Sequence, residues 1–305
     1  MGLYNQTMFI LVGFTVRPEV EICIFSVMLI IYLLSLFGNL AIVAAILVEK
    51  CLQTPMYFFL SSLAFADIGF ISCTVPTLLY ILATENGAIS KTDCIMQLYF
   101  YVSFGSAEFI LLGIMSVDRY VAISHPLRYS SIITSKMCAW LILLSWVIGF
   151  FAFIYPIKLL FNLSFCGPFK INHFFCESSV FLKISCSDTN FFYMVFTFFA
   201  GAIILVSFMI TFVSYVYIIS AIMKISSSSG KKKAFSTCTS HFTAVSMLYG
   251  CVIFLYIRPA ESVSMDLNKV INVLNSILTP FSNPFLYTLR NKNVQNVIKR
   301  TLRIQ

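Results

Sequence analysis

Charged residues are scarce in this sequence. Only 10% of its 305 residues are Asp, Glu, Lys or Arg, and 59% are hydrophobic. A soluble globular protein carries roughly 25% charged residues. A chain with so few has no polar coat for its apolar surface in water, which excludes an ordinary soluble domain. A membrane protein with several spans fits better, because lipid can cover that surface.

Histidine is also rare, and no catalytic motif accompanies the three that occur, His125, His173 and His241. The spacings of a nucleophilic serine elbow, of a zinc-binding His-Glu-x-x-His pair and of a phosphate-binding loop do not occur. We therefore predict that the chain is not an enzyme and has no organic cofactor. His173, Cys176 and Glu177 could bind a soft metal, but a disulfide would consume the thiol, so we expect no metal there.

Long apolar runs are what the sequence does contain. A helix of about 20 residues crosses the ~30 Å of hydrocarbon in a bilayer. Seven windows of that kind lie near residues 22–48, 57–82, 95–123, 138–160, 191–223, 234–257 and 269–289. The runs are continuous rather than alternating, which favours helices over barrel strands. The sequence predicts an all-α membrane protein, a single seven-helix bundle whose first run serves as an uncleaved signal anchor.

Charge and glycosylation sequons predict the orientation of this bundle. With the N-terminus outside, most of the 20 basic residues reach the cytoplasmic side, accompanied by only two acids, Glu49 and Asp118. This bias follows the positive-inside rule. The sequons at Asn5 and Asn162 then lie outside, where Asn5 is expected to be glycosylated. The basic balance indicates membrane lipid and a cytosolic partner rather than nucleic acid.

Two cytoplasmic segments carry much of the positive charge. SSSSGKKK at 226–233 predicts a short flexible hinge between the fifth and sixth spans, either a solvated loop or a docking surface. Residues 291–305 place four apolar residues at helical spacing among basic ones. That pattern predicts a short amphipathic helix at the C-terminus, lying on the anionic inner leaflet.

The ten cysteines divide by location. Cys94, Cys166, Cys176 and Cys186 fall on the outer side, and an even set there implies two disulfides with three possible pairings. Three of the four lie in the longest loop, about residues 161–190, and crosslinks argue against disorder in it. The other six cysteines fall in or near the spans and are interpreted as small core residues.

Two acids lie in the middle of predicted spans, where lipid offers them no partner. Asp67 and Glu108 are expected to face the bundle interior and to share a proton, water or a cation. A hydrogen-bonded pair that only fixes helix packing is one alternative. A proton relay of a transporter is another, although the inverted repeats typical of many transporters are not visible.

Two further motifs suggest moving parts. Asp118 and Arg119 stand together at the cytoplasmic end of the third run, where an inserted partner could draw the arginine to a new contact. A pair that merely snorkels to the interface is the alternative. In the last span, Pro280 and Pro284 remove backbone donors, and Ser282 and Asn283 are expected to re-satisfy the freed carbonyls. Such a helix can swing or keep a static kink.

These stretches together resemble vertebrate olfactory receptors, which are rhodopsin-like G-protein-coupled receptors. MSVDRYVAISHPLRYS at 115–130 is similar to the third-span signature of that family. The resemblance extends to PMYFFLSSLAFADI at 55–68, KAFSTCTSHFTAV at 233–245, PFSNPFLYTLRN at 280–291 and the cysteine spacing of the loop at 165–189. Ser116, Val117 and Ser124 depart from the usual Ala, Tyr and Cys, but the Asp-Arg-Tyr core is intact.

The resemblance implies roles for particular residues. It pairs Cys94 with Cys176 and Cys166 with Cys186. It implies an activation switch made of Asp118, Arg119, Tyr120, Tyr215, Lys233, His241, Asn283, Pro284 and Tyr287. It implies a central polar site at Asp67, Glu108 and Asn283, with sodium as a possible occupant.

The resemblance also implies a ligand pocket among the third, fifth, sixth and seventh spans. Counting along the helices from the motifs gives Tyr101, Val102, Gly105, Ser106, Phe199, Ile203, Tyr249, Val252, Ile253, Tyr256, Val273 and Ser276. This set is apolar and aromatic with a few hydroxyls and no charge, which favours a small, neutral, volatile odorant over an amine.

The resemblance therefore implies an odorant receptor of the plasma membrane, expected in the cilia of olfactory neurons. Ligand binding would activate a stimulatory-type heterotrimeric G protein and raise cyclic AMP. Two alternatives stay open on the sequence. One is a receptor of the same fold for a lipid or metabolite, and the other is an ion-coupled transporter that uses Asp67 and Glu108.

Overall fold

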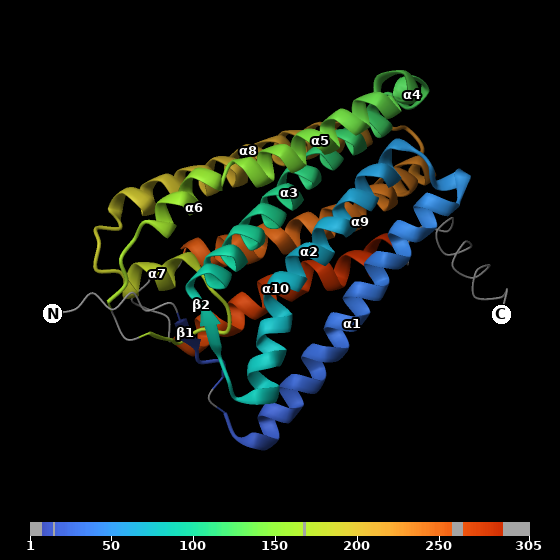
Figure 1. Cartoon of the computed structure of the whole chain (residues 1–305). Helices are drawn as coiled ribbons and strands as arrows, with labels where there is room; N and C mark the ends of the chain where they lie inside the picture. Colours follow the sequence, from blue (N-terminus) through green and yellow to red (C-terminus); the bar gives the residue numbers. More distant parts are fainter. Residues whose placement is uncertain (1–7, 15, 167–168, 258–264, 289–305) are drawn as a thin grey trace.

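The computed structural model describes residues 8–14, 16–166, 169–257 and 265–288. The predicted glycosylation at Asn5 and the predicted amphipathic helix after residue 290 lie outside this part. Long helices run side by side through the molecule (Figure 1). They are α1 Pro18–Val48, α2 Pro55–Thr84, α3 Lys91–Ser124, α5 Ser135–Phe151 with α6 Ile154–Phe161, α8 Asn190–Lys224, α9 Ser228–Ile257 and α10 Met265–Thr288.

Hydropathy separates these helices into two groups. By length and composition, α1, α2, α3, the joined α5 and α6, and α8 could each cross a membrane. In α9 the apolar stretch is shorter, Cys238–Ile253, and α10 carries more polar residues. The predicted seven apolar windows all correspond to helices, and the sixth and seventh windows are the most polar of them.

Most helices begin a few residues before the predicted windows because of local start signals. Proline occupies the first turn of α1 at Pro18 and of α2 at Pro55, where its missing N–H costs nothing. Ser90 caps α3 by accepting a hydrogen bond from the backbone N–H of Asp93 at 3.0 Å. Polar caps and prolines lie outside an apolar window, so hydropathy alone places the ends too far inward.

The predicted flexible hinge at 226–233 is wrong. Helix α9 already begins at Ser228, so Lys231 and Lys232 are helical and only residues 225–227 join α8 to α9. The physical reason is Ser227, whose hydroxyl accepts a hydrogen bond from the N–H of Gly230 at 3.1 Å. A serine in this position satisfies a free donor of the first turn and starts a helix inside the serine run.

One end of the bundle is closed by crosslinked loops, and we call it the disulfide end. Strand β1 (Met8–Leu11) lies between β2 (Ala88–Ser90) and β3 (Lys170–Ile171), antiparallel to β2 and parallel to β3. The long loop also contains a short helix, α7 (Ser178–Ile184). Disulfides join Cys94 to Cys176 and Cys166 to Cys186, the pairs that the resemblance implies.

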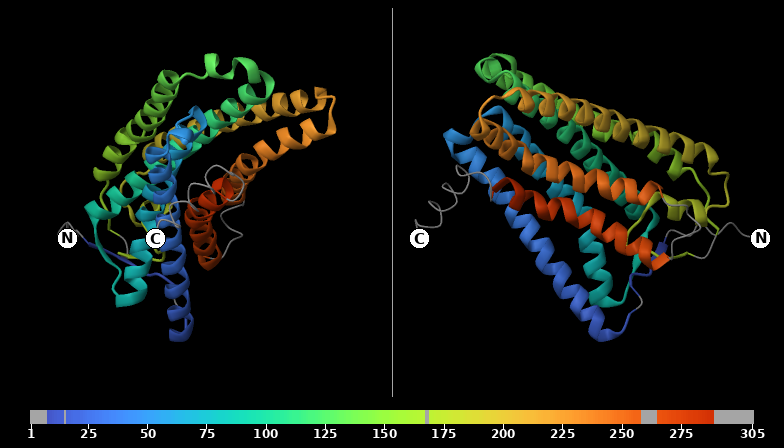
Figure 2. Two further views of the ribbon diagram at one scale, coloured as in Figure 1. Left: turned by 90° about the vertical axis from the view of Figure 1, so that its right-hand side faces the viewer. Right: turned by 180° about the vertical axis from the view of Figure 1, so that it is seen from behind.

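The opposite end is built from short turns, and we call it the α4 end (Figures 1 and 2). It holds the 3-10 turns η1 (Lys50–Leu52) and η2 (Pro126–Arg128) and the single-turn helix α4 (Tyr129–Ile132). The short link between α8 and α9 lies at this end too.

Two glycines let helices approach closely. A Cβ atom on Gly149 of α5 would lie 2.9 Å from the carbonyl oxygen of Ser103 in α3. A Cβ atom on Gly38 of α1 would lie 2.9 Å from the Cβ of Pro284 in α10. Both distances are too short for a real side chain, so these helix pairs depend on glycine.

The carbonyl group left without its helical donor at Pro284 in α10 has other partners than predicted. Pro284 has no N–H to donate to the carbonyl oxygen of Pro280, one turn earlier. Ser35 and Asn39 of α1 donate to that oxygen instead, each at 2.9 Å. The expectation that Ser282 and Asn283 would serve the freed carbonyls is wrong for this one, because the amide of Asn283 donates to Asp67 on α2.

Candidate functional site

The central polar cluster consists of Asp67, Glu108 and Asn283, which come from three helices. All three side chains are fully buried. Asn283 donates through Nδ2 to Oδ2 of Asp67 at 2.9 Å, and the carboxyl groups of Asp67 and Glu108 interact electrostatically. Oδ1 of Asp67, both carboxyl oxygens of Glu108 and Oδ1 of Asn283 have no hydrogen-bond partner among the described residues. Such an all-oxygen set fits a small hard cation, water or a shared proton.

A second buried polar group lies at the α4 end, around Arg119. Arg119 donates through Nε at 3.1 Å, and also through Nη2, to Oδ2 of Asp118. The hydroxyl of Tyr129 donates to the other carboxyl oxygen of Asp118 at 2.6 Å. Asp118 therefore has two partners, and it holds the loop that contains α4 against the end of α3.

A third contact ties the neighbouring helices α8 and α9 to α3. The hydroxyl of Tyr215 on α8 lies 2.8 Å from Nδ1 of His241 on α9. Nε2 of His241 lies 3.2 Å from the carbonyl oxygen of Leu112 on α3. His241 is only 2% exposed. One imidazole thus bridges the three helices whose ends surround Arg119.

Most of the predicted switch residues that the structure describes lie together, and Tyr120 differs. Tyr287 is buried and interacts electrostatically with both Asp67 and Arg119. Tyr120 instead packs against Tyr217 on α8, with ring centroids 5.6 Å apart. The side chain of Lys233 lies outside the part that the structure describes.

The predicted ligand residues fall on the expected helices but differ in burial. Ser106, Tyr249, Val273 and Ser276 are buried, whereas Ile253 is 47% exposed and so does not join the buried set. The side chain of Tyr256 is outside the described part. The others are half-buried: Tyr101, Val102, Gly105, Phe199, Ile203 and Val252.

The loop of the disulfide end covers this region with aromatic rings. The ring of Tyr101 lies 4.7 Å from that of Phe70 and 5.1 Å from that of Phe175, measured between centroids. His173 stacks beside Phe174 at 4.8 Å, and burial, together with the charge of Lys269, lowers the pKa of His173 to about 4. At pH 7 the histidine is therefore neutral, and its 3.5 Å contact with Glu177 is not an ion pair.

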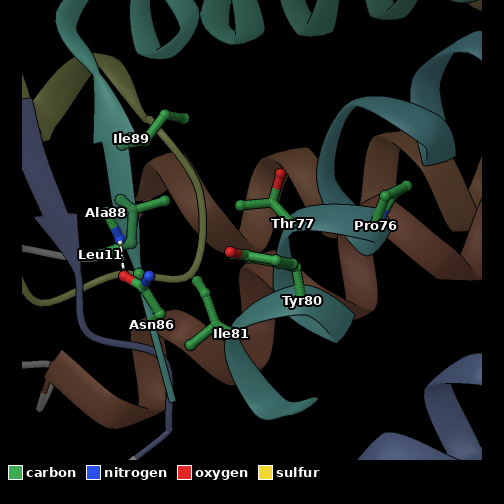
Figure 3. A pocket seen from close by; sticks show the side chains of 9 residues that line it. Leu11, Pro76, Thr77, Tyr80, Ile81, Asn86, Ala88 and Ile89 are labelled. Atoms are coloured by element: carbon green, nitrogen blue, oxygen red, sulfur yellow. Dashed lines mark hydrogen bonds between the residues drawn. The ribbon is translucent and has the colours of Figure 1, made fainter. Parts of the chain in front are cut away.

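A separate pocket of about 320 Å³ lies at the disulfide end (Figure 3). Pro76, Thr77, Tyr80 and Ile81 of α2 form one wall, and Leu11 and residues 86–89 form the other. None of the predicted ligand residues whose side chains the structure describes lines it. It is a surface feature beside β2 and not the predicted odorant site.

Sequence reasoning missed two sets of polar residues. Tyr129 was missed because its contact with Asp118 depends on the turn at Pro126, which spacing does not determine. The second set lies on α10, where Asn272 and Thr279 are buried beside the predicted Ser276 and Asn283. Their spacing of four, three and four residues places them on one helix face, and this periodicity was a readable signal.

Comparisons with known proteins agree on one family. The olfactory receptor family model matches residues 28–305. Rat olfactory receptor 287 is 47% identical over 97% of this chain and 95% of its own length. Human olfactory receptor 6F1 is 45% identical over 98% of both chains, and human olfactory receptor 6C70 is 43% identical over 98% of this chain and 96% of its own.

Proposed function

The chain belongs to the olfactory receptor family, and from this premise we propose that it binds a small volatile odorant within the helix bundle and activates a stimulatory-type heterotrimeric G protein, which raises cyclic AMP. It is a multi-pass protein of the plasma membrane and a signalling receptor rather than an enzyme. The proposal places the disulfide end outside the cell, where oxidising conditions preserve disulfides, and the α4 end in the cytosol.

The observation that carries the proposal is the set of polar contacts around Arg119. Asp118 holds Arg119 and Tyr129, while His241 links Tyr215 to α3. The His241 contacts tie α8 and α9 to α3, and the Asp118 contacts hold Arg119 and the α4 segment at the end of α3. A G protein needs a groove between the α4 ends of these helices for a helix of its own, so the described arrangement corresponds to the resting receptor.

The ligand would shift the balance between this resting arrangement and an open one. An odorant that binds the open form more tightly shifts the population by its difference in affinity for the two forms. Tyr249 is a suitable link, because its ring packs against Phe109 on α3 at 5.4 Å and against Phe208 on α8 at 5.3 Å. A ligand that displaces this ring would move α9 relative to both neighbours.

The central polar cluster is proposed to hold a sodium ion in the resting state. The unpartnered oxygens of Asp67, Glu108 and Asn283 support this assignment, because buried carboxyl oxygens need a cation, a proton or a donor. Sodium would offset one of the two carboxylate charges, and these three side chains would hold it in place. On activation, Tyr287 and α10 would rearrange toward Arg119.

The test is a cyclic-AMP assay in cells that express this chain together with an olfactory-type stimulatory G protein. Volatile mixtures should produce a saturable response, and Arg119→Ala should abolish it while surface expression persists. Arg17→Ala removes an exposed arginine at the opposite end and serves as the matched control. Full signalling by Arg119→Ala would refute the switch, and the absence of any response from a surface-expressed receptor would refute coupling to this G protein.

A further inference from the structure

Helix α10 presents an unusually polar face to the bundle interior. Asn272, Ser276, Thr279 and Asn283, which we call the polar stripe, are no more than 4% exposed. The amide of Asn272 lies 3.4 Å from Nε2 of His173, and the amide of Asn283 donates to Asp67. Because both ends of the stripe contact interior residues, Ser276, which lies between them on the same face, also points inward.

Two polar atoms near the middle of this face have no partner among the described residues. They are the hydroxyl of Ser276 and the amide oxygen of Asn275. Residue Ser276 is 0% exposed and residue Asn275 is 8% exposed. The amide nitrogen of Asn275 donates to the hydroxyl of Tyr101 on α3 at 3.3 Å, which places this side chain between α10 and α3. A buried polar atom without a partner is costly, so a natural ligand or water is expected to satisfy it.

The surroundings of these two atoms are apolar. Tyr101 stacks on Phe70 and packs against Phe175. Val273 and Ile277, on the same helix, pack into a core cluster with Ile71, Val75 and Phe175. A ligand that meets Asn275 and Ser276 must therefore be an apolar molecule that carries a hydrogen-bonding group.

The charges and hydrogen-bonding capacity of the surrounding residues limit which polar group the ligand can carry. Asn275 and Ser276 are neutral, and the ammonium of Lys269, further toward the disulfide end, donates to the carbonyl oxygen of Gly13 at 2.9 Å. A carboxylate would face the amide oxygen of Asn275 without a donor to offer it. A hydroxyl can donate to the amide oxygen of Asn275 and can accept from the hydroxyl of Ser276, whereas an aldehyde or ketone can only accept.

We propose that this receptor recognises neutral alcohols, with the ligand hydroxyl bound by Asn275 and Ser276 and its hydrocarbon part packed beside Tyr101. The inference rests on the proposed odorant-binding function and specifies its ligand class. Asn275 is the residue that sequence reasoning did not include in the pocket. The hydroxyl would satisfy both unpartnered atoms at once, and a matched alkane would leave both of them buried and unpaired.

The first experiment measures binding without any G protein. The melting temperature of the purified, detergent-solubilised receptor is recorded with straight-chain alcohols from butanol to decanol and with benzyl alcohol. Each alcohol is compared with the hydrocarbon of the same skeleton, because a ligand that binds the folded state raises the melting temperature. At least one alcohol should stabilise the receptor, with an affinity at least about tenfold above that of its hydrocarbon. Stabilisation by no alcohol, or equally by the hydrocarbons, would overturn the proposal.

Variants then assign the hydroxyl to its two partners. Ser276→Ala and Asn275→Ala should each weaken alcohol binding about tenfold, while Ser276→Thr, which keeps the hydroxyl, should retain it. Ser103→Ala is the matched control. Ser103 is equally buried and its hydroxyl also has no partner among the described residues, but it lies against α5 at Gly149. Unchanged binding in both alanine variants, or an equal loss in Ser103→Ala, would overturn the assignment.

These experiments distinguish a failure of the proposed ligand class from a failure of the proposed G-protein coupling. An alcohol that raises the melting temperature without a cyclic-AMP response supports the ligand class and refutes the proposed coupling. A cyclic-AMP response to hydrocarbons but not to alcohols supports coupling and overturns the ligand class.

Discussion

The two ends of the bundle are held together by different kinds of bond. The disulfide end has two covalent crosslinks, a three-stranded sheet and the fully buried ring of Phe9 among other phenylalanines. The α4 end depends on polar contacts of Asp118 and His241. Polar contacts can exchange partners for little free energy, whereas a disulfide cannot. This contrast indicates that the disulfide end is a fixed frame and that signalling motion belongs to the α4 end.

The largest expected effect comes from opening the frame. Cys94→Ser breaks the disulfide between α3 and the long loop. This disulfide joins two cysteines that are 82 residues apart in the sequence. Loss of a native disulfide costs about 2–5 kcal/mol and often prevents folding. Delivery to the cell surface, measured by labelling intact cells, should be lost. Cys23→Ser changes an exposed free cysteine and should leave delivery normal; normal delivery of Cys94→Ser would contradict the fixed frame.

The second crosslink should matter less than the first. Cys166 and Cys186 are separated by only 20 residues, so their bond removes less entropy from the unfolded chain. The loop-closure relation puts the difference at about 1 kcal/mol. Cys166→Ser should therefore reduce surface delivery without abolishing it, in the same labelling assay. Equal losses in the two serine variants would show that loop length does not rank these bonds.

At the α4 end, a single atom should change signalling without harming the fold. Tyr129→Phe removes the hydroxyl that donates to Asp118 at 2.6 Å. A hydrogen bond to a charged group contributes about 1.5–3 kcal/mol, so the resting state should lose stability relative to the open one. Ligand-independent cyclic AMP should rise about tenfold at equal surface expression. Tyr193→Phe, which changes an exposed side chain of α8, is the control. An unchanged basal cyclic-AMP level in Tyr129→Phe would show that this hydrogen bond does not stabilise the resting state.

The sequence predicted the helices well because long apolar runs in a bilayer have few alternatives. It also predicted that Asp67 and Glu108 are buried, since they interrupt otherwise apolar segments. It could not predict contacts that depend on chain geometry, such as the bond from Tyr129 to Asp118 or the two donors from α1 to Pro280. The prediction for the start of α9 was wrong for a local reason. Ser227 caps the helix within a serine run that was interpreted as a flexible hinge.

The smallest expected effect is a pH dependence confined to the disulfide end. Burial and the charge of Lys269 lower the pKa of His173 from its ordinary value of 6.5 to about 4, so the unfolded chain binds a proton that the folded one excludes. Stability should therefore be independent of this group above pH 6.5 and should fall as the pH drops from 6.5 toward about 4. The melting temperature of the purified receptor should decrease by a few degrees over this range. His173→Gln should flatten that slope, whereas His125→Gln, at an exposed site of the α4 end, should not. If the slope persists in His173→Gln, acid sensitivity arises elsewhere, and the fixed frame of the disulfide end does not depend on a neutral histidine.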